Sequence, residues 1–273
     1  MNFDNVFVLG GDKRSRYIAE YFRNTALCLT DLTASLTESD RKSLCDADLV
    51  ILGLPAVING MVNMPLADFN LPFEQLLDLC GDKTKVAGGR FDKNSRELME
   101  KKNIKWADYS EDEIFQLENA FYTAEGALST LVANTESSLW GMNILITGGG
   151  RIAKALCSLL RPCSCRVSVY ARNPVVRTSF ALSGFETLDF LENLEGFDAV
   201  INTVPADIFS EGVMETLGKD SIVIDLSQRP GYVSKTLCEE LGLKLLYLPG
   251  IPLTSAPRSA GISAARAAER IFQ

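Results

Sequence analysis

Short runs of consecutive apolar residues alternate along the chain with stretches in which apolar residues recur every three or four positions. Such runs are typical of buried strands, and such stretches are typical of helices with one buried face. Strands that alternate with helices form a parallel sheet with helices packed on it. In the first segment the pattern predicts strands at 6–9, 26–29, 49–52, 85–87 and 104–107, and helices around 17–22, 73–79 and 95–102.

A longer helical pattern, from Glu111 to about Thr135, separates this segment from a second series of strands. Its apolar residues form one stripe, and Glu125 lies on the flank of that stripe. One interpretation makes Glu125 an edge carboxylate that reaches water. The other makes it a partly desolvated carboxylate in an interdomain cleft, with a raised pKa suited to proton transfer. The second series of strands is predicted at 143–146, 167–170, 198–205 with its exit loop, 222–226 and 244–248, before a terminal helix through Ile271.

The first strand of this second series ends in a glycine turn that opens a helix. Gly148-x-Gly150-x-x-Ala153 is the dinucleotide-binding fingerprint, with alanine in the third small position. Gly148 allows the tight turn, Gly150 lets the backbone approach a pyrophosphate, and Ala153 lets the helix pack closely on its strand. The phosphates then meet the free amides at the start of the helix. The turn therefore predicts a dinucleotide-binding domain.

The next strand indicates which dinucleotide is bound. It ends at Ala171-Arg172-Asn173, where NAD-specific sites carry an acidic residue for the ribose hydroxyls. A guanidinium suits a 2′-phosphate instead, so Arg172 predicts NADP. The loops that leave the later strands lie beside the ribose and nicotinamide. The expected cofactor-binding residues are Gly148, Gly149, Gly150, Arg151, Ile152, Ala171, Arg172, Asn173, Asn202, Thr203, Val204, Pro205, Asp225 and Leu226.

These patterns together predict an α/β protein with two doubly wound parallel-sheet domains joined by a long hinge helix. Residues 1–120 are expected to form an N-terminal α/β substrate or catalytic domain. Residues 121–253 are expected to form a Rossmann NADP-binding domain. Residues 254–273 are expected to form a C-terminal helix that packs back near the hinge.

Composition narrows the class of partner. The net charge is −8 without basic runs, which argues against nucleic acid. No apolar stretch reaches membrane-spanning length, and the first residues lack the pattern of a signal peptide, so a cytoplasmic protein is expected. An acidic protein that binds anions must concentrate positive charge locally, which draws attention to arginines at loop ends.

The sequence has no histidine and seven scattered cysteines. Without histidine, Ser–His and Cys–His nucleophile systems are excluded, and proton transfer must use Asp, Glu, Lys, Tyr, Cys or water. Cys163-Ser164-Cys165 has no second pair at zinc-site spacing. No metal site is therefore expected, and the thiols are expected to be reduced.

Read together, the exit loops resemble those of the A subunit of bacterial dipicolinate synthase. The likeness covers the chain from about Tyr122 onward, and it reaches the first segment through Gly10-Gly11-Asp12 and Arg14. The matching stretches are 124–126, 148–152, 169–172, 201–205, 225–231, 249–252 and 256–261.

The resemblance implies NADP-dependent oxidation of dihydrodipicolinate to dipicolinate in sporulation. It also implies a second, flavoprotein-like B subunit of dipicolinate synthase in the mother-cell cytoplasm, and an architecture similar to that of the D-2-hydroxyacid dehydrogenases. A homo-oligomer is left open. The substrate implied carries two carboxylates, which require convergent cations. Arg229, Arg14 and Arg258 are the candidates for that role, each weighed against an ordinary surface or ion-pair role.

Hydride transfer from a dihydropyridine ring also requires that a proton leave the ring. Glu125 is the first candidate acceptor, Asp12 is the second and water is the third. Two alternatives are kept. One is another dehydrogenase of a small carboxylic acid. The other is a non-catalytic protein that binds NADP as a sensor or scaffold.

Overall fold

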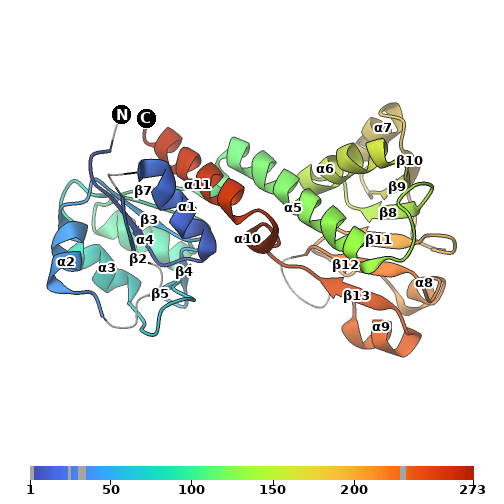
Figure 1. Cartoon of the computed structure of the whole chain (residues 1–273), viewed down its shortest axis with the longest axis horizontal. Coiled ribbons are helices and arrows are strands. Elements are labelled where there is room, and N and C mark those ends of the chain that lie inside the picture. Colours follow the sequence, from blue (N-terminus) through green and yellow to red (C-terminus); the bar gives the residue numbers. More distant parts are fainter. Residues whose placement is uncertain (1–2, 24–25, 30–34, 228–231) are drawn as a thin grey trace. The chain divides into compact units, whose positions relative to one another are not determined.

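The computed structural model describes residues 3–23, 26–29, 35–227 and 232–273 (Figure 1). The chain divides into two compact units. Met1–Asn119 and Ala256–Gln273 form the first unit, and Ala120–Ser255 forms the second. The long helix α5 (Glu113–Asn134) begins in the first unit and ends in the second. No helix among the described residues is long and apolar enough to cross a membrane.

The first unit is built on a five-stranded parallel sheet in the order β2-β1-β3-β6-β7. This order places a topological switch point between β1 and β3, where open α/β sheets bind ligands at the carboxyl ends of the strands. A small antiparallel hairpin of β4 and β5 lies outside this sheet. The strands are β1 (Val6–Leu9), β2 (Ala26–Leu29), β3 (Leu49–Leu52), β4 (Val57–Ile58), β5 (Met61–Val62), β6 (Lys85–Gly88) and β7 (Lys105–Asp108).

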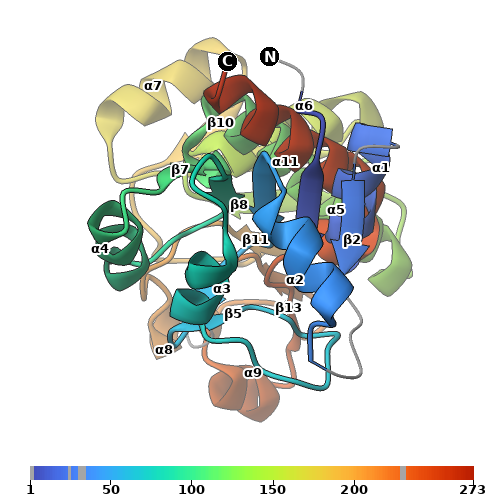
Figure 2. The same ribbon diagram turned by 90° about the vertical axis from the view of Figure 1, so that its left-hand side faces the viewer.

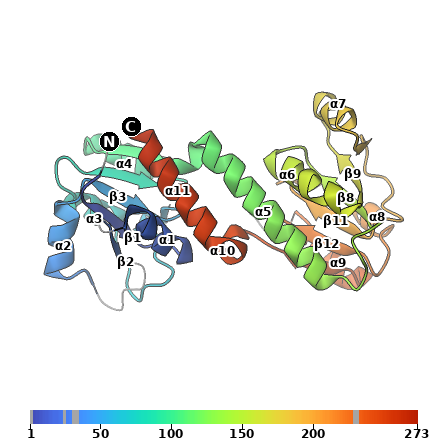
Figure 3. The ribbon, with the colours of Figure 1, turned by 45° about the horizontal axis from the view of Figure 1, so that its top comes forward.

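Alternate residues of these strands build two cores, because successive side chains point to opposite faces. Phe7 and Leu9 join the core under α2, α3 and α4 (Figure 2), whereas Val6 and Val8 join the core under α1 and α11. Helix α11 lies beside α1 (Figure 3). Its small residues, among them Ala264 and Ala268, are buried in the core that these helices cover. The helices are α1 (Lys13–Phe22), α2 (Glu38–Cys45), α3 (Phe73–Leu79), α4 (Lys93–Lys101), η2 (Tyr109–Glu111) and α11 (Pro257–Ile271).

An ion pair ties α11 to the start of α5 within the first unit. Arg270 Nη2 lies 2.5 Å from Asp112 Oδ1, and Arg270 Nε donates to Oδ2 at 3.1 Å. Asp112 also accepts the amide of Phe115 at 2.8 Å and so caps α5. The hydrogen bonds from Arg270 lower the pKa of Asp112 below its usual value.

This depressed pKa predicts a specific loss of stability in acid. A carboxylate whose pKa is lower in the folded state stabilises that state above the unfolded pKa of 3.8, and the stabilisation is lost as the pH falls through the folded value. Asp112→Asn keeps a capping oxygen but removes the charge. We expect the variant to be less stable than the parent at pH 6, and the difference to shrink towards pH 2. Urea unfolding of both proteins across this range measures it, and a difference independent of pH would contradict the assignment.

The second unit is built on a six-stranded parallel sheet in the order β10-β9-β8-β11-β12-β13. Renumbered from its first strand, this is the Rossmann order 3-2-1-4-5-6, with the switch point between β8 and β11. The strands are β8 (Asn143–Thr147), β9 (Arg166–Tyr170), β10 (Glu186–Leu188), β11 (Ala199–Asn202), β12 (Ile222–Asp225) and β13 (Lys244–Tyr247).

Helices cover both faces of this second sheet. Ile144 and Ile146 face the core formed with α5, α6 and α7, whereas Leu145 faces the core formed with α8 and α9 (Figure 1). The residues of both cores are almost entirely inaccessible to solvent. This close packing holds the sheet rigid beneath its exit loops. The remaining elements are α6 (Arg151–Leu160), η3 (Arg161–Cys163), α7 (Pro174–Leu182), α8 (Glu211–Met214), α9 (Lys235–Leu241) and α10 (Pro252–Ser255).

The predicted α/β class with two parallel sheets is confirmed. Each strand and helix expected from the apolar pattern forms within a few residues of its expected bounds. The β4–β5 hairpin was not predicted, although Asn59-Gly60 carries the signal for it. Both residues have positive φ, 52° and 76°, which a two-residue hairpin turn of this sense requires.

Candidate functional site

The glycine turn after β8 leaves no room for side chains at its first two positions. Gly148 has a φ of 102°, and a Cβ there would lie 2.4 Å from Thr203 Oγ1. A Cβ on Gly149 would lie 2.1 Å from Cγ1 of Val176 on α7. The turn therefore packs directly against the exit of β11 and against α7, which only glycine permits at these two positions.

Gly150 differs from its two neighbours. It is the N-cap residue of α6, with extended backbone and no capping side chain. A Cβ added there would meet nothing within 4 Å. Arg151 and Ile152 form the first turn of α6, with Arg151 exposed and Ile152 half-buried. The open space at Gly150 thus lies at a helix N-terminus, where backbone amides favour an anion.

A broad pocket of about 720 Å³ opens beside this turn. Arg172 is the charged residue among the described residues that line it, and no carboxylate is among them. The lining residues come from the glycine turn, the exit of β9, the start of α7 and the loop after β11: Gly148, Gly149, Tyr170, Ala171, Arg172, Asn173, Pro174, Val176, Val204 and Ile208.

The exit of β9 is held in place by α7. Arg177 Nη1 donates to the carbonyl of Ala171 at 2.7 Å and to that of Arg172 at 2.9 Å. Asn173 caps α7 by accepting the amide of Val175 at 2.9 Å. The side chain of Arg172 is exposed at the pocket. Sequence reasoning did not single out Arg177, although a basic residue one helical turn after the capping Asn173 is placed to bind these carbonyls.

Asn202 and Asp225 hold the exit loops from inside the sheet. Both are buried, as is Thr147. Thr147 Oγ1 donates to Asn202 Oδ1 at 2.7 Å, and Asn202 Nδ2 donates to Asp225 Oδ1 at 2.9 Å. Asn202 also binds both backbone groups of Val204, its amide at 3.0 Å and its carbonyl at 3.1 Å. These two predicted cofactor-binding residues thus shape the loop with buried side chains.

The other predicted cofactor neighbours lie at the same edge. Thr203 is half-buried, and its hydroxyl donates to the carbonyl of Thr147 at 2.7 Å. Val204 lines the pocket and Pro205 is exposed after it. Leu226 is buried in the core below. The parallel register of β8, β11 and β12 is what brings these separate loops to one edge of the sheet.

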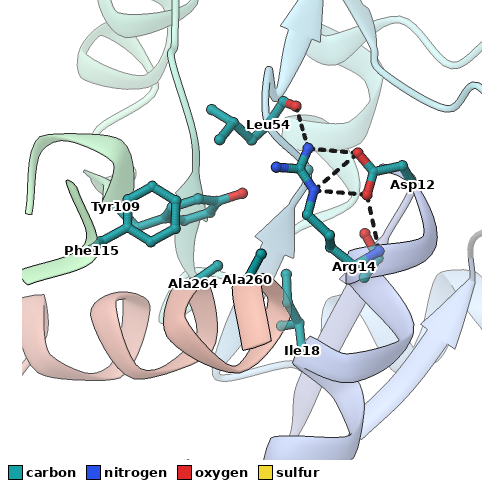
Figure 4. Close-up of a pocket in the computed structure, with 10 residues that line it drawn as sticks. Asp12, Arg14, Ile18, Leu54, Tyr109, Phe115, Ala260 and Ala264 are labelled. Carbon is teal, nitrogen blue, oxygen red and sulfur yellow. Dashed lines mark hydrogen bonds and ion pairs between the residues drawn. The ribbon is translucent and has the colours of Figure 1, made fainter. Parts of the chain in front are cut away.

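In the first unit, Asp12 and Arg14 form one ion pair at the carboxyl end of β1 (Figure 4). Arg14 Nη2 lies 2.6 Å from Asp12 Oδ2, and Nε donates to Oδ1 at 2.9 Å. Arg14 Nη2 also donates to the carbonyl of Leu54, after β3, at 2.9 Å. Burial lowers the pKa of Arg14, but the bonds and charge of Asp12 outweigh this and leave it raised. Arg14 is therefore charged and nearly enclosed.

Tyr109 completes this small pocket. Its hydroxyl points towards the Arg14 guanidinium and donates to the carbonyl of Leu52 at 3.1 Å (Figure 4). Burial is the main reason that the pKa of Tyr109 lies far above its usual value. Tyr109 therefore stays neutral, lines one side of the pocket and forms a hydrogen bond there. The predictions from sequence did not include it.

The remaining predicted catalytic residues either do not line these pockets or fall outside the described residues. Glu125 is exposed on α5, in the second unit. Arg258 Nη2 lies 2.6 Å from Glu20 Oε1 in a solvent-exposed pair between α11 and α1. Arg229 falls outside the described residues. Among the described residues, no group of three or more His, Cys, Asp or Glu could hold a metal ion.

Two parallel-sheet units, one with Rossmann order and a glycine turn at its switch point, define the dehydrogenase-like class of α/β proteins. Comparison with solved structures agrees. The apo D-lactate dehydrogenase of Escherichia coli aligns with a TM-score of 0.60 and 13% identity, covering 95% of this chain and 93% of that one. At this identity the likeness concerns the fold alone.

Within that class the chain is similar to the A subunit of dipicolinate synthase, the family that its motifs resemble. Residues 5–110 match the family described as the N-terminal domain of the dipicolinate synthase A subunit. The family match lies in the first segment, which the motif resemblance reached only through Gly10-Gly11-Asp12 and Arg14. The dipicolinate synthase A subunit of Bacillus subtilis is 29% identical over 146 residues, which are 52% of this chain and 49% of that protein. The alignment thus spans about half the length of that relative. The crystal structure of the dipicolinate synthase A subunit from Bacillus halodurans has a TM-score of 0.85 and 22% identity, covering 100% of this chain and 99% of that one.

Proposed function

We propose that this chain is an NADP-dependent oxidoreductase that converts dihydrodipicolinate to dipicolinate. The observation that carries the proposal is the pocket beside the glycine turn, in which Arg172 is exposed and no described lining residue is acidic. A carboxylate at this place would repel a 2′-phosphate, whereas a guanidinium binds it by two hydrogen bonds. The similarity to the dipicolinate synthase A subunit supports the choice of substrate.

The residues present fit a nicotinamide dinucleotide. Gly148 and Gly149 bring the backbone close to the pocket, and the open space at Gly150 lies where a pyrophosphate meets the start of α6. The bound cofactor would accept the hydride. The buried network of Thr147, Asn202 and Asp225 would hold the loop beside it at a fixed distance. Positioning of this kind accounts for much of the rate of a hydride transfer.

Few groups in this chain are candidates to accept the proton that leaves the substrate ring. Both carboxylate oxygens of Asp12 already accept hydrogen bonds from Arg14, so Asp12 is the weaker candidate for the proton acceptor. Glu125 has an exposed side chain and stays our first candidate, with water as the alternative. Arg14, Arg258 and Arg229 stay candidates for the substrate carboxylates. We also propose a cytoplasmic location, and the B subunit of dipicolinate synthase as the partner.

The direct experiment supplies dihydrodipicolinate, generated in situ, to the purified chain with NADP or NAD, and follows pyridine absorbance. We expect product with NADP, and more slowly with NAD. Binding of NADP without product, in the presence and absence of the B subunit, would favour the alternative of a non-catalytic NADP-binding sensor or scaffold. Turnover of another small carboxylic acid in a substrate panel would favour the alternative dehydrogenase.

Arg172→Ala should separate the two cofactors. Loss of a charged hydrogen-bonding group to the 2′-phosphate is expected to weaken NADPH binding by about tenfold or more, and to change NADH binding less than twofold. Fluorescence titration of both cofactors measures this. Arg166→Ala is the matched control, because Arg166 is an exposed arginine at the opposite end of β9. Equal losses of NADPH and NADH affinity would contradict the NADP assignment.

A further inference from the structure

The loop that leaves β6 carries an arginine in an unusual backbone conformation. Arg90 has a φ of 55°, in the left-handed region that glycine adopts easily and other residues adopt at a cost. Its amide donates to Asp108 Oδ1 at 2.9 Å and to Ser110 Oγ at 3.2 Å, which holds the backbone there. A glycine would fit this position without strain. The backbone conformation therefore does not explain why this position carries an arginine.

The guanidinium of Arg90 has no hydrogen bond or ion pair within the part of the chain that the structure describes. Burial is the main cause that lowers the pKa of Arg90, and the positive charge of Arg14 lowers it further, against the opposing effect of Asp108. The Arg90 side chain is exposed, so solvent screens its charge from that of Arg14. Asp108 is already paired with Arg96, at 2.9 Å. The Arg90 guanidinium is therefore open to an anion from solvent.

Close backbone packing brings the two arginines to the same edge of the sheet. A Cβ on Gly53, after β3, would lie 2.5 Å from the Cα of Gly11, after β1. The amide of Gly89 donates to the carbonyl of Gly53 at 3.0 Å. Leu54 contacts both the Arg14 side chain and the loop that carries Arg90. Its carbonyl accepts a hydrogen bond from Arg14, and its side chain occupies the space where a Cβ of Gly89 would be. This carboxyl edge includes the switch point between β1 and β3, where ligands bind in such folds, and β6 lies next to β3.

We propose that Arg90 and Arg14 together bind a small dicarboxylate at the carboxyl edge of the first unit's sheet. The identity of the acid rests on the proposed function, whereas the pairing of the arginines does not. Arg14 is anchored by Asp12 and Leu54 through Nε and Nη2, while Nη1 has no partner among the described residues. Arg90 contributes a full guanidinium. A dianion can bind both cations, whereas a single carboxylate binds one.

The test uses two arginines that share the same backbone feature. Arg23 ends α1 with a φ of 52° and is exposed, so Arg23→Gly and Arg90→Gly each relieve a left-handed arginine and remove one charge. Calorimetric titration of the full chain with pyridine-2,6-dicarboxylate and with pyridine-2-carboxylate, with and without NADP, compares the variants. Thermal unfolding monitors their folding.

We expect Arg90→Gly to unfold at the same temperature as the parent or higher, and to lose at least tenfold in affinity for the dicarboxylate. Its affinity for the monocarboxylate should fall by less than threefold. Arg23→Gly should leave both affinities within twofold. Unchanged dicarboxylate affinity in Arg90→Gly, an equal loss in Arg23→Gly, or no binding of either acid by the parent would overturn the proposal. Failure of the proposed function is distinct: dicarboxylate binding would depend on Arg90, but dihydrodipicolinate and NADP would give no product.

Discussion

Gly150→Ala is expected to abolish tight dinucleotide binding while leaving the fold of the second unit intact. The added methyl meets no protein atom within 4 Å, so the folded state has room for it. Alanine in place of glycine at an N-cap costs about 1 kcal/mol. A pyrophosphate at the start of α6 would occupy that same space. We expect NADPH affinity to fall by about a hundredfold, which corresponds to about 2.7 kcal/mol.

Gly212→Ala is the matched control for this result. Gly212 lies on the short helix α8, is exposed, and also has nothing within 4 Å of an added Cβ. It should bind NADPH like the parent. Thermal unfolding and fluorescence titration of both variants separate stability from binding. If Gly150→Ala bound NADPH normally, the pyrophosphate would have to lie elsewhere, and the cofactor proposal would lose its geometric basis.

The glycine turn of the second unit could be predicted from sequence because one local pattern specifies it. A strand, a glycine turn and a helix are contiguous in the chain, so Gly148 and Gly150 predict the turn directly. Asn202 and Asp225 were also recognised, as part of exit loops. Their burial was not foreseeable, because it depends on the register between β11 and β12 and on a hydrogen bond that joins residues far apart in sequence.

In the first unit, only some of the candidate site residues could be predicted from the sequence. Asp12 and Arg14 follow a predicted strand and were named as candidates. Tyr109 and Arg90 were not named, since nothing local marks them: Arg90 follows two glycines, and its left-handed backbone depends on Asp108 from the next strand. The position of Glu125 on the flank of the α5 stripe was predicted. Whether its side chain reaches water was left open, and in the structure that side chain is exposed.

Asp108→Ala should be among the most damaging single substitutions in the first unit. The carboxylate side chain is 1% exposed and accepts hydrogen bonds from the amides of Arg90, Phe91 and Ser110, at 2.9, 3.0 and 3.0 Å. It also binds Arg96 at 2.9 Å. Removal leaves buried donors unpaired and frees the loop that carries Arg90. We expect a loss of about 3–5 kcal/mol in the free energy of unfolding.

A tryptophan close to this carboxylate offers a direct probe of that loss. Trp106 packs edge-on against Phe91 and lies under the Arg96 guanidinium, 5.4 Å from ring centroid to Cζ. The sequence has two tryptophans, and Trp140 is 80% exposed, so Trp140→Phe makes Trp106 the sole reporter of the first unit. Urea unfolding in this background measures Asp108→Ala.

Asp92→Ala serves as the comparison in the same background. Asp92 caps α4 by accepting the amide of Ser95 at 2.7 Å, and it is exposed. Loss of a cap of this kind costs about 1 kcal/mol. Asp92 and Asp108 lie at either end of the segment that contains α4 and β7. The difference between the two losses of unfolding free energy therefore measures what burial and multiple hydrogen-bond donors add at Asp108. A loss at Asp108 no larger than the loss at Asp92 would mean that the Arg90 loop holds its conformation without the carboxylate.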